Sequence, residues 1–328
     1  MLNENIIKAY DIVYKNNQPL PKEIALELAK LEGSDILDLM SLAHKVRVKY
    51  AQDEHICTIH NAKSGACSQN CSYCAQSSFF KTAIEVYPFQ DFDIIASAAE
   101  KTLNNGVNIF GLVTQGYGYK KINREFQQIL DTIDKLYEKF PNLQVCGSFG
   151  ILSEETAKAL ADHKVVHYNH NLQVNPPKYK ELIATTHTIE ERIETVKLVK
   201  KYGIQACCGG IFGLGETMED RVELAYALRE LDVEIIPLNV LIPIEGTAVE
   251  NVEPIPAAEV AKSFAITRLV NPTKAIKFAA GRETRMKDFQ GLLMLAGANG
   301  FLTGGYLTTR GRETSEDKKL MEEIELFC

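Results

Sequence analysis

The sequence lacks tryptophan, low-complexity tracts and any run of 18 apolar residues. A transmembrane helix needs about 20 predominantly apolar residues, so no membrane partner is expected. The N-terminal segment MLNENIIKAYDIVYKN also has neither the basic start nor the continuous apolar stretch of a secretory signal. These absences predict a cytoplasmic protein.

Positive charge is also in short supply. The 36 Lys and Arg residues are outnumbered by 43 Asp and Glu residues, which gives a formal net charge of -7. Proteins that bind nucleic acid through its phosphates usually present an excess of positive charge. The charge balance therefore argues against nucleic acid and favours a small-molecule partner.

Cysteine is infrequent, with eight residues among 328. Cytosolic thiols stay reduced, and a chain of this length can bury a large core without covalent staples. A disulfide framework is therefore not expected, and binding of a metal or a cluster is the leading use of these cysteines.

The apolar pattern predicts a TIM-type (β/α)8 barrel with an N-terminal helical extension. Residues 1–52 are predicted as helices with short polar breaks, and short apolar runs then alternate with amphipathic segments, as in repeated βα units. One domain is expected, with the barrel over 53–315 and a C-terminal tail over 316–328. A doubly wound open sheet is the alternative. The predicted strands are 55–60, 107–113, 143–149, 164–169, 204–211, 233–240, 275–280 and 299–304, and the predicted barrel helices are 91–106, 122–140, 153–163, 188–203, 217–231, 256–270 and 285–298.

The strongest local motif directly follows the first predicted strand. The segment NAKSGACSQNCSYCAQSS gives Cys67, Cys71 and Cys74 the spacing C-x3-C-x2-C. Three thiolates can hold a four-iron cluster while leaving one iron open for a small molecule. The alternative is a structural zinc site, which needs a fourth protein ligand. His60 is the nearest candidate, but its position inside a predicted strand is awkward for that role.

The three-cysteine motif resembles the radical S-adenosylmethionine superfamily, and within it the chain resembles the biotin synthase family. The motifs that carry this resemblance are NAKSGACSQNCSYCAQS, YNHNLQ, ACCGGIFGLGET, PLNVLIPIEGT, AAGRE, AGAN and YLTT, in the family's order. The resemblance implies a [4Fe-4S] cluster, S-adenosylmethionine, dethiobiotin as substrate and an auxiliary iron-sulfur cluster that donates sulfur. It also implies a homodimer and an external electron donor of the flavodoxin or ferredoxin type.

The resemblance assigns four residues to the S-adenosylmethionine site. Tyr73 resembles the aromatic residue set near the adenine, and Arg192 resembles the arginine that meets the methionyl carboxylate. Asn171 is similar to an asparagine near the ribose. Gln173 stands where the family often has an aspartate on the ribose, so an altered affinity is expected rather than a loss of binding.

The resemblance also assigns the substrate contacts. Asn169, Asn171 and Asn239 resemble the asparagines that contact the ureido ring, which suits amide side chains because they both donate and accept hydrogen bonds. Thr308 and Thr309 in YLTT resemble the pair that holds the substrate carboxylate. Without the ordered set of motifs, isolated asparagines and threonines would be interpreted as turn caps.

The auxiliary-cluster ligands depart from the family pattern, which uses three cysteines and an arginine for a [2Fe-2S] cluster. Cys146 and Cys207 have counterparts there. Phe110 or Gly111 stands where the third cysteine would be, and Lys277 stands where the arginine would be. A protonated lysine could supply charge, but it has no lone pair to offer a metal.

Cys57 on the first predicted strand is the candidate replacement, because the family resemblance places that position inside the barrel. We predict that Cys57, Cys146 and Cys207 hold an auxiliary cluster, with a four-iron cluster carrying an extra sulfur as the hypothesis and a [2Fe-2S] cluster as the alternative. Strand alternation turns Cys208 the other way. Cys328, at the end of the chain, is not expected to be a ligand.

The resemblance implies that the enzyme converts dethiobiotin to biotin by radical sulfur insertion at C9 and C6. One alternative is a related radical enzyme acting on another small molecule, like the hydrogenase-cofactor maturases or the methylornithine synthases. The other is a non-catalytic iron-sulfur binding protein, for which the three-cysteine loop alone would suffice.

Overall fold

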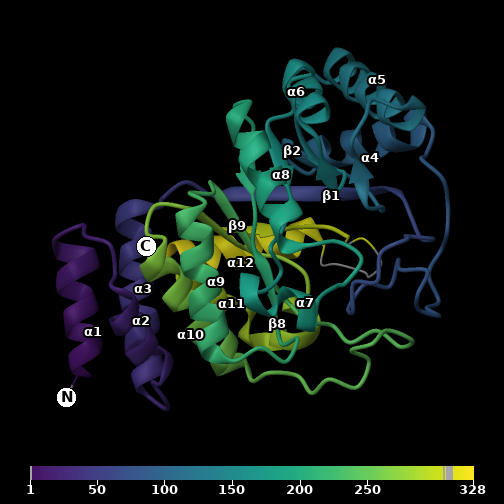
Figure 1. The fold of residues 1–328 in the computed structure, drawn as a ribbon. Coiled ribbons are helices and arrows are strands. Elements are labelled where there is room, and N and C mark those ends of the chain that lie inside the picture. The colour runs from purple at the N-terminus through teal and green to yellow at the C-terminus, as the bar shows by residue number, and fades with distance from the viewer. Residues whose placement is uncertain (1, 306, 308–312) are drawn as a thin grey trace.

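The computed structural model describes residues 2–305, 307 and 313–328. Its main sheet closes into a parallel barrel, because β1 pairs with both β2 and β11, and β9 pairs with both β7 and β10 (Figure 1). This confirms the predicted (β/α)8 barrel and excludes the open sheet. The barrel strands are β1 (His55–Lys63), β2 (Ile109–Thr114), β4 (Gln144–Ser148), β6 (His167–Asn169), β7 (Gln205–Cys207), β8 (Gly210–Phe212), β9 (Ile235–Val240), β10 (Ala275–Phe278) and β11 (Gly300–Leu302).

The predicted strand 204–211 divides into β7 and β8, which pair with successive parts of β9. Gly209 lies in the break, where a Cβ atom would collide with the Pro237 carbonyl. Only glycine allows the two backbones to approach so closely. The barrel thus has eight strand positions, one of which β7 and β8 share.

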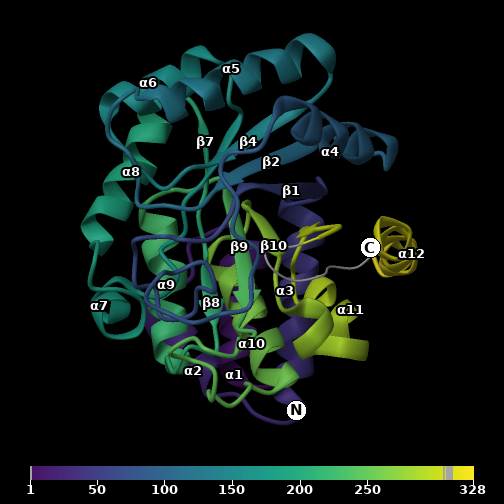
Figure 2. The same ribbon diagram turned by 90° about the vertical axis from the view of Figure 1, so that its right-hand side faces the viewer.

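The helices follow the strands and cover the outside of the barrel (Figure 2). They are α4 (Phe92–Asn104), α5 (Arg124–Lys139), α6 (Glu154–Asp162), α7 (Tyr179–Leu182), α8 (Ile189–Lys201), α9 (Met218–Glu230), α10 (Ala257–Val270) and α11 (Gln290–Leu295). All predicted barrel helices are present. α11 is shorter than predicted, because a π-helical turn at Arg282–Met286 and a 3-10 turn at Lys287–Phe289 precede it.

Local sequence fixes where several helices begin. Thr188 and Glu191 form a reciprocal capping box at α8, and Thr217 and Asp220 form another at α9. Each box satisfies backbone N–H groups that have no partner within the helix. The two helices therefore start at defined residues.

The N-terminal segment forms the predicted helical layer, with α1 (Glu4–Ala9), a π-helical turn at Tyr10–Lys15, α2 (Lys22–Ala29) and α3 (Asp35–Tyr50). In Figure 1 this layer lies at one end of the molecule, beside α10. Every residue of α10 from Val260 to Val270 is buried. An ordinary barrel helix exposes one face, so this burial follows from the extra layer that α2 and α3 add.

The C-terminal segment ends in a helix, α12 (Thr314–Glu325), over most of the stretch interpreted from sequence as a tail. Asp317 of α12 accepts hydrogen bonds from Arg282, with its two oxygens 2.7 and 2.6 Å from the guanidinium nitrogens. Both side chains are 1% exposed. This pair fixes α12 to the loop after β10.

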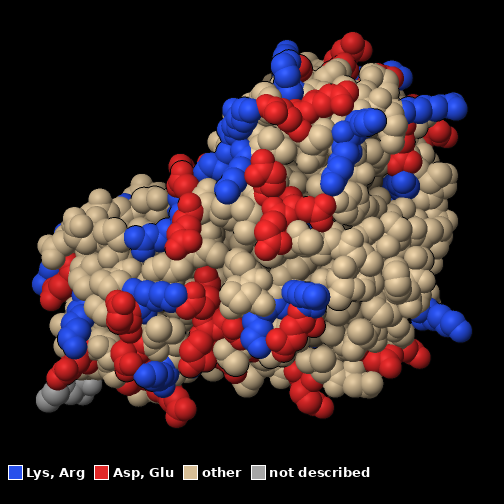
Figure 3. All heavy atoms as spheres, in the orientation of Figure 1, with Lys and Arg blue, Asp and Glu red and all other residues tan. Residues whose placement is uncertain are grey.

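Figure 3 shows acidic and basic side chains interspersed on the face that it displays, with a largely uncharged area over the side that carries the loop after β1.

A small two-stranded parallel sheet, β3 (Gly118–Tyr119) with β5 (Ile151–Leu152), lies outside the barrel sheet. Within the described part of the chain, no helix has the length and apolar character required to cross a membrane.

Candidate functional site

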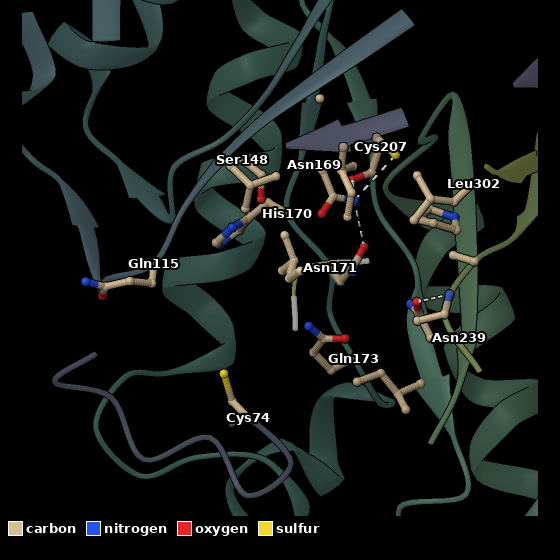
Figure 4. Close-up of a pocket in the computed structure, with 18 of the residues that line it drawn as sticks. Cys74, Gln115, Ser148, Asn169, His170, Asn171, Gln173, Cys207, Asn239 and Leu302 are labelled. Carbon is tan, nitrogen blue, oxygen red and sulfur yellow. Dashed lines mark hydrogen bonds between the residues drawn. The ribbon is translucent and has the colours of Figure 1, made fainter. Parts of the chain in front are cut away.

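A cavity of about 410 Å³ lies inside the barrel and reaches the loop that follows β1. Figure 4 shows side chains from several strands and loops around it. Its lining contains both predicted cysteine triads, which are Cys67, Cys71 and Cys74 from the loop, and Cys57, Cys146 and Cys207 from β1, β4 and β7. Cysteines from position 57 to position 207 in the sequence therefore line one cavity.

The three-cysteine loop is held by its own backbone. The Cys67 N–H donates to the Gln76 carbonyl over 2.9 Å, and the Cys74 N–H donates to the Cys71 carbonyl over 3.0 Å. Ser77 also donates its hydroxyl to the Gln69 carbonyl over 2.6 Å. These bonds keep the loop folded back on itself, so that all three thiols line the cavity.

The environment of these thiols fits a cluster. None of the three forms a disulfide. Burial raises the pKa of Cys71 to about 12 and that of Cys74 to about 11. Without iron, Cys71 and Cys74 are therefore neutral thiols. Iron binding would replace the proton of each with a metal bond, so that each thiolate would be paired with a cation.

The zinc alternative is not supported by the position of His60. Its Nε2 atom lies 2.7 Å from Gln90 Oε1, and the ring is not part of the cavity lining. Among the described residues, no three His, Cys, Asp or Glu side chains form a group that could hold a metal ion. The three sulfur atoms need not lie as close together for a four-iron cluster as for a single metal ion, because each cysteine binds a different iron.

The predicted cofactor residues meet on one side of the cavity. Gln173 donates from Nε2 to the Tyr73 hydroxyl over 2.7 Å, while its Oε1 atom is buried without a partner. Arg192 donates from Nε to the Asn171 carbonyl over 2.6 Å. No carboxylate of the described residues lies within ion-pair distance of Arg192. Gln173 and Arg192 both line the cavity, and the Nη1 atom of Arg192 also lies 3.4 Å from His187 Nε2. An acceptor without a partner and a guanidinium without a carboxylate are the groups that a ribose and a carboxylate would require.

The three predicted substrate amides also line the cavity (Figure 4). Asn169 Nδ2 lies 3.2 Å from Asn171 Oδ1 and 3.4 Å from Cys207 Sγ. Asn239 donates to the Gly210 carbonyl over 3.1 Å and accepts from the Ala280 N–H over 3.0 Å. Each amide keeps some hydrogen-bonding capacity. The predicted carboxylate pair, Thr308 and Thr309, lies outside the described residues.

The strand register shows where the residues lie that differ from the family's auxiliary-cluster ligands. Gly111 is paired with Cys146 and lines the cavity, whereas Phe110 is 1% exposed and belongs to the surrounding core. Cys208 is fully buried in that core and does not line the cavity. Cys57 lines it, in agreement with the predicted interior position. The ligand roles of Cys57, Cys146 and Cys207 stay predictions.

Cys328 lies away from this site. Its Sγ atom is 2.6 Å from Arg47 Nη1 on α3, and the Phe327 carbonyl is 2.7 Å from His44 Nε2 on the same helix. The end of the chain therefore packs against the N-terminal layer.

Lys277 extends from β10 into the space around the second triad. Its Nζ atom donates to Cys57 Sγ over 3.0 Å, and the residue is 3% exposed. Burial alone would lower the pKa of Lys277, but the thiols of Cys57 and Cys207, as thiolates, raise it above its ordinary value. The lysine side chain is therefore buried among the sulfur atoms of this triad.

Sequence reasoning missed several histidines of the cavity. His55 and His167 line it, with ring centroids 5.2 Å apart. Burial, followed by the charge of Lys277, lowers the pKa of His55 to about 3 and that of His167 to about 4. Strand alternation could have identified both, since His55 lies two residues before Cys57 and His167 two residues before Asn169.

Two family models match the chain. The Radical SAM superfamily matches residues 62–227, and the Biotin and Thiamin Synthesis associated domain matches residues 237–326. The biotin synthase of Pelodictyon phaeoclathratiforme is 54% identical, over 99% of this chain and 98% of that protein. The biotin synthase of Chlorobaculum tepidum is 50% identical, over 99% of this chain and 98% of that protein.

Solved structures give the same architecture at low sequence identity. A methylornithine synthase aligns with a TM-score of 0.80 at 17% identity, covering 97% of this chain and 95% of that one. A maturase of the [FeFe]-hydrogenase aligns with a TM-score of 0.81 at 17% identity, covering 98% of this chain and 73% of that one. At such identities the similarity shows the fold alone.

Proposed function

Because this chain belongs to the biotin synthase family of radical S-adenosylmethionine enzymes, we propose that it converts dethiobiotin to biotin inside its barrel. The observation that carries the proposal is the shared cavity, which is lined by two cysteine triads and three asparagines. Sulfur insertion needs a radical source, a sulfur source and a substrate between them. One cavity with two cysteine triads meets that requirement.

Cys67, Cys71 and Cys74 would hold the [4Fe-4S] cluster. When bound, this cluster and S-adenosylmethionine supply a 5'-deoxyadenosyl radical, and the auxiliary cluster supplies sulfur. The cofactor's carboxylate suits Arg192, which has no ion-pair partner among the described carboxylates. Its ribose suits the buried Oε1 atom of Gln173, which needs a donor.

The asparagines orient the substrate. Dethiobiotin carries a neutral urea, which both donates and accepts hydrogen bonds, and an amide side chain offers the same two functions. Asn169 and Asn171 lie beside Cys207, so a ureido ring bound by them would sit next to the second triad. Thr308 and Thr309 remain the proposed carboxylate contacts.

Cys57, Cys146 and Cys207 would hold the auxiliary cluster. Three cysteine thiols line this end of the cavity, and Lys277 cannot act as a fourth ligand while it is protonated. This favours a four-iron cluster whose remaining iron carries a non-protein sulfur. A [2Fe-2S] cluster with substituted ligands is the competing assignment.

The wall of the cavity has a second task. Most of its wall is formed by strand residues and by the folded loop, which limits access of water to a reactive radical. We further propose a cytoplasmic homodimer that takes electrons from a flavodoxin or a ferredoxin, on the grounds of family membership.

The proposal is tested by an anaerobic assay. Reconstituted protein is incubated with S-adenosylmethionine, a reductant and dethiobiotin, and 5'-deoxyadenosine and biotin are followed by mass spectrometry. We expect biotin with about two equivalents of 5'-deoxyadenosine, one for each carbon-sulfur bond.

Two other outcomes would contradict the proposal in different ways. Cofactor cleavage without biotin would retain the radical chemistry and point to another small-molecule substrate. A lack of cleavage by protein that demonstrably carries its cluster would favour a non-catalytic iron-sulfur protein.

A further inference from the structure

Lys277 is a buried lysine whose side-chain nitrogen donates a hydrogen bond to a thiol. Its Nζ atom lies 3.0 Å from Cys57 Sγ, and the residue is 3% exposed. No carboxylate of the described residues lies within ion-pair distance of it. His55 and His167 also line this cavity, and no aspartate or glutamate is among the described residues of the lining. Compensating negative charge must therefore come from sulfur.

Burial makes this charge balance important. An ammonium removed from water without an anionic partner is strongly unfavourable, and proteins pair such groups or replace them by apolar ones. A lysine at this position is therefore hard to explain as packing alone, since methionine would fill a similar volume without a charge. Lys277 fits the site only if the thiols around it, or a group bound to them, carry negative charge.

The donor count points further. An ammonium has three N–H groups, and one contact of Lys277 is made to Cys57. Lys277 also lines the cavity, together with Cys146 and Cys207. Within the part of the chain that the structure describes, two N–H groups therefore remain for another acceptor. Inorganic sulfide bound to iron is an anionic acceptor of that kind.

We propose that the Lys277 ammonium is a positioning residue that hydrogen-bonds the sulfur of the auxiliary cluster and neutralises part of its negative charge. This inference rests on the proposed function, because it requires a cluster at Cys57, Cys146 and Cys207. Lys277 holds the sulfur-bearing group in place without being a metal ligand. Its positive charge also favours the more negative, reduced state of the cluster.

The test compares two buried lysines. Lys277→Met removes the charge with little change in volume, and Lys262→Met does the same on α10, where Lys262 donates to the Leu31 carbonyl and does not line the cavity. Each full-length variant is reconstituted anaerobically, and iron, sulfide and the auxiliary-cluster midpoint potential are measured. In electron paramagnetic resonance spectra, the cluster that binds S-adenosylmethionine is identified because its signal changes when that cofactor is added.

We expect Lys277→Met to shift the auxiliary-cluster potential to a more negative value, and Lys262→Met to leave it unchanged. If the wild-type protein contains two clusters, an unchanged auxiliary-cluster potential and an unchanged sulfide-to-iron ratio in Lys277→Met would overturn the inference. A wild-type chain with a single cluster would instead overturn the auxiliary-cluster proposal, and this inference with it.

A second variant covers the case in which Lys277→Met cannot retain the auxiliary cluster. Lys277→Ala is then reconstituted in two separate samples, one with ethylammonium and one with ethanol. Either compound can occupy the space left by the side chain, but only ethylammonium is a cation. Recovery of auxiliary iron with ethylammonium alone supports a cationic donor. Equal recovery with both, or recovery with neither, contradicts it.

Discussion

Gln173 donates a hydrogen bond from its side-chain amide to the hydroxyl of Tyr73 over 2.7 Å. The contact joins the segment after β6 to the three-cysteine loop, although 100 residues separate the two positions. Gln173 also has φ of +74°, a left-handed conformation that few residues with side chains adopt. Its Oε1 atom is buried and has no partner. Such a strained position with a free acceptor is typical of a binding site.

Gln173→Ala should therefore weaken S-adenosylmethionine binding. The loss of one hydrogen bond to the cofactor corresponds to about 1.4 kcal/mol, or about a tenfold rise in its KM. The KM for dethiobiotin should change little. Steady-state kinetics with each substrate varied in turn would measure both, and Gln90→Ala, which removes the partner of His60 outside the cavity lining, is the control.

The second prediction concerns the auxiliary site. Cys57→Ala should lose auxiliary iron and sulfide and form no biotin, while cofactor cleavage at the other triad continues. The matched control is Cys208→Ala, because Cys208 is fully buried next to Cys207 but does not line the cavity. Iron and sulfide analysis with the absorption spectrum would decide the matter. A Cys57→Ala protein with the full iron and sulfide content and a normal spectrum would refute the assignment.

The third prediction concerns the attachment of α12. Asp317→Ala should lower the free energy of unfolding by about 3 kcal/mol, because it removes the carboxylate that binds both terminal nitrogens of the buried Arg282 guanidinium. The ion pair of Arg282 Nε with Glu283, at 3.3 Å, remains in the variant. Asp162→Ala breaks an exposed ion pair with Lys158 and should cost about 0.5 kcal/mol or less. Denaturant unfolding of both variants measures the difference. Equal effects would show that the buried pair does not stabilise the helix.

The fourth prediction is a pH dependence. Burial, followed by the nearby Arg192, lowers the pKa of His187 to about 4, against about 6.5 in an unfolded chain. Below pH 6.5 the unfolded state takes up a proton that the folded state does not, so stability falls as the pH falls. Between pH 7.5 and 5.5 this residue should account for about 1 kcal/mol of the loss.

His187→Gln should remove that part of the pH dependence, because glutamine does not titrate in this range. Unfolding of the variant and the wild type at several pH values would measure it. Parallel pH profiles for the two proteins would show that His187 titrates normally in the folded state.

Much of the barrel could be predicted because its repeating unit is local. Each βα unit can be recognised in the sequence as a short apolar run followed by an amphipathic segment. Capping residues such as Thr188 and Thr217 also mark where helices begin. The break at Gly209 and the helical C-terminal segment were not predicted. Gly209 depends on the backbone of a different strand, and α12 depends on Asp317 meeting Arg282.

The candidate site likewise contains residues that could be predicted from the sequence and residues that could not. Cys67, Cys71 and Cys74 could be recognised together because they lie within eight residues of one loop. His55 and His167 were missed because neither belongs to a motif, and their meeting depends on the curvature of the closed sheet. The choice between Phe110 and Gly111 likewise required the register of β2 against β4.

The sequence by itself determined the class of fold, the three-cysteine loop and the family, because periodicity, spacing and motif order are properties of neighbouring residues. Only the tertiary structure decided that Cys57, Cys146 and Cys207 share one cavity with that loop, and that Lys277 lies 3.0 Å from Cys57. Barrel closure brings strands that are distant in sequence to a common interior. The charge environment of a buried lysine depends on all of those strands at once, so no single segment could reveal it.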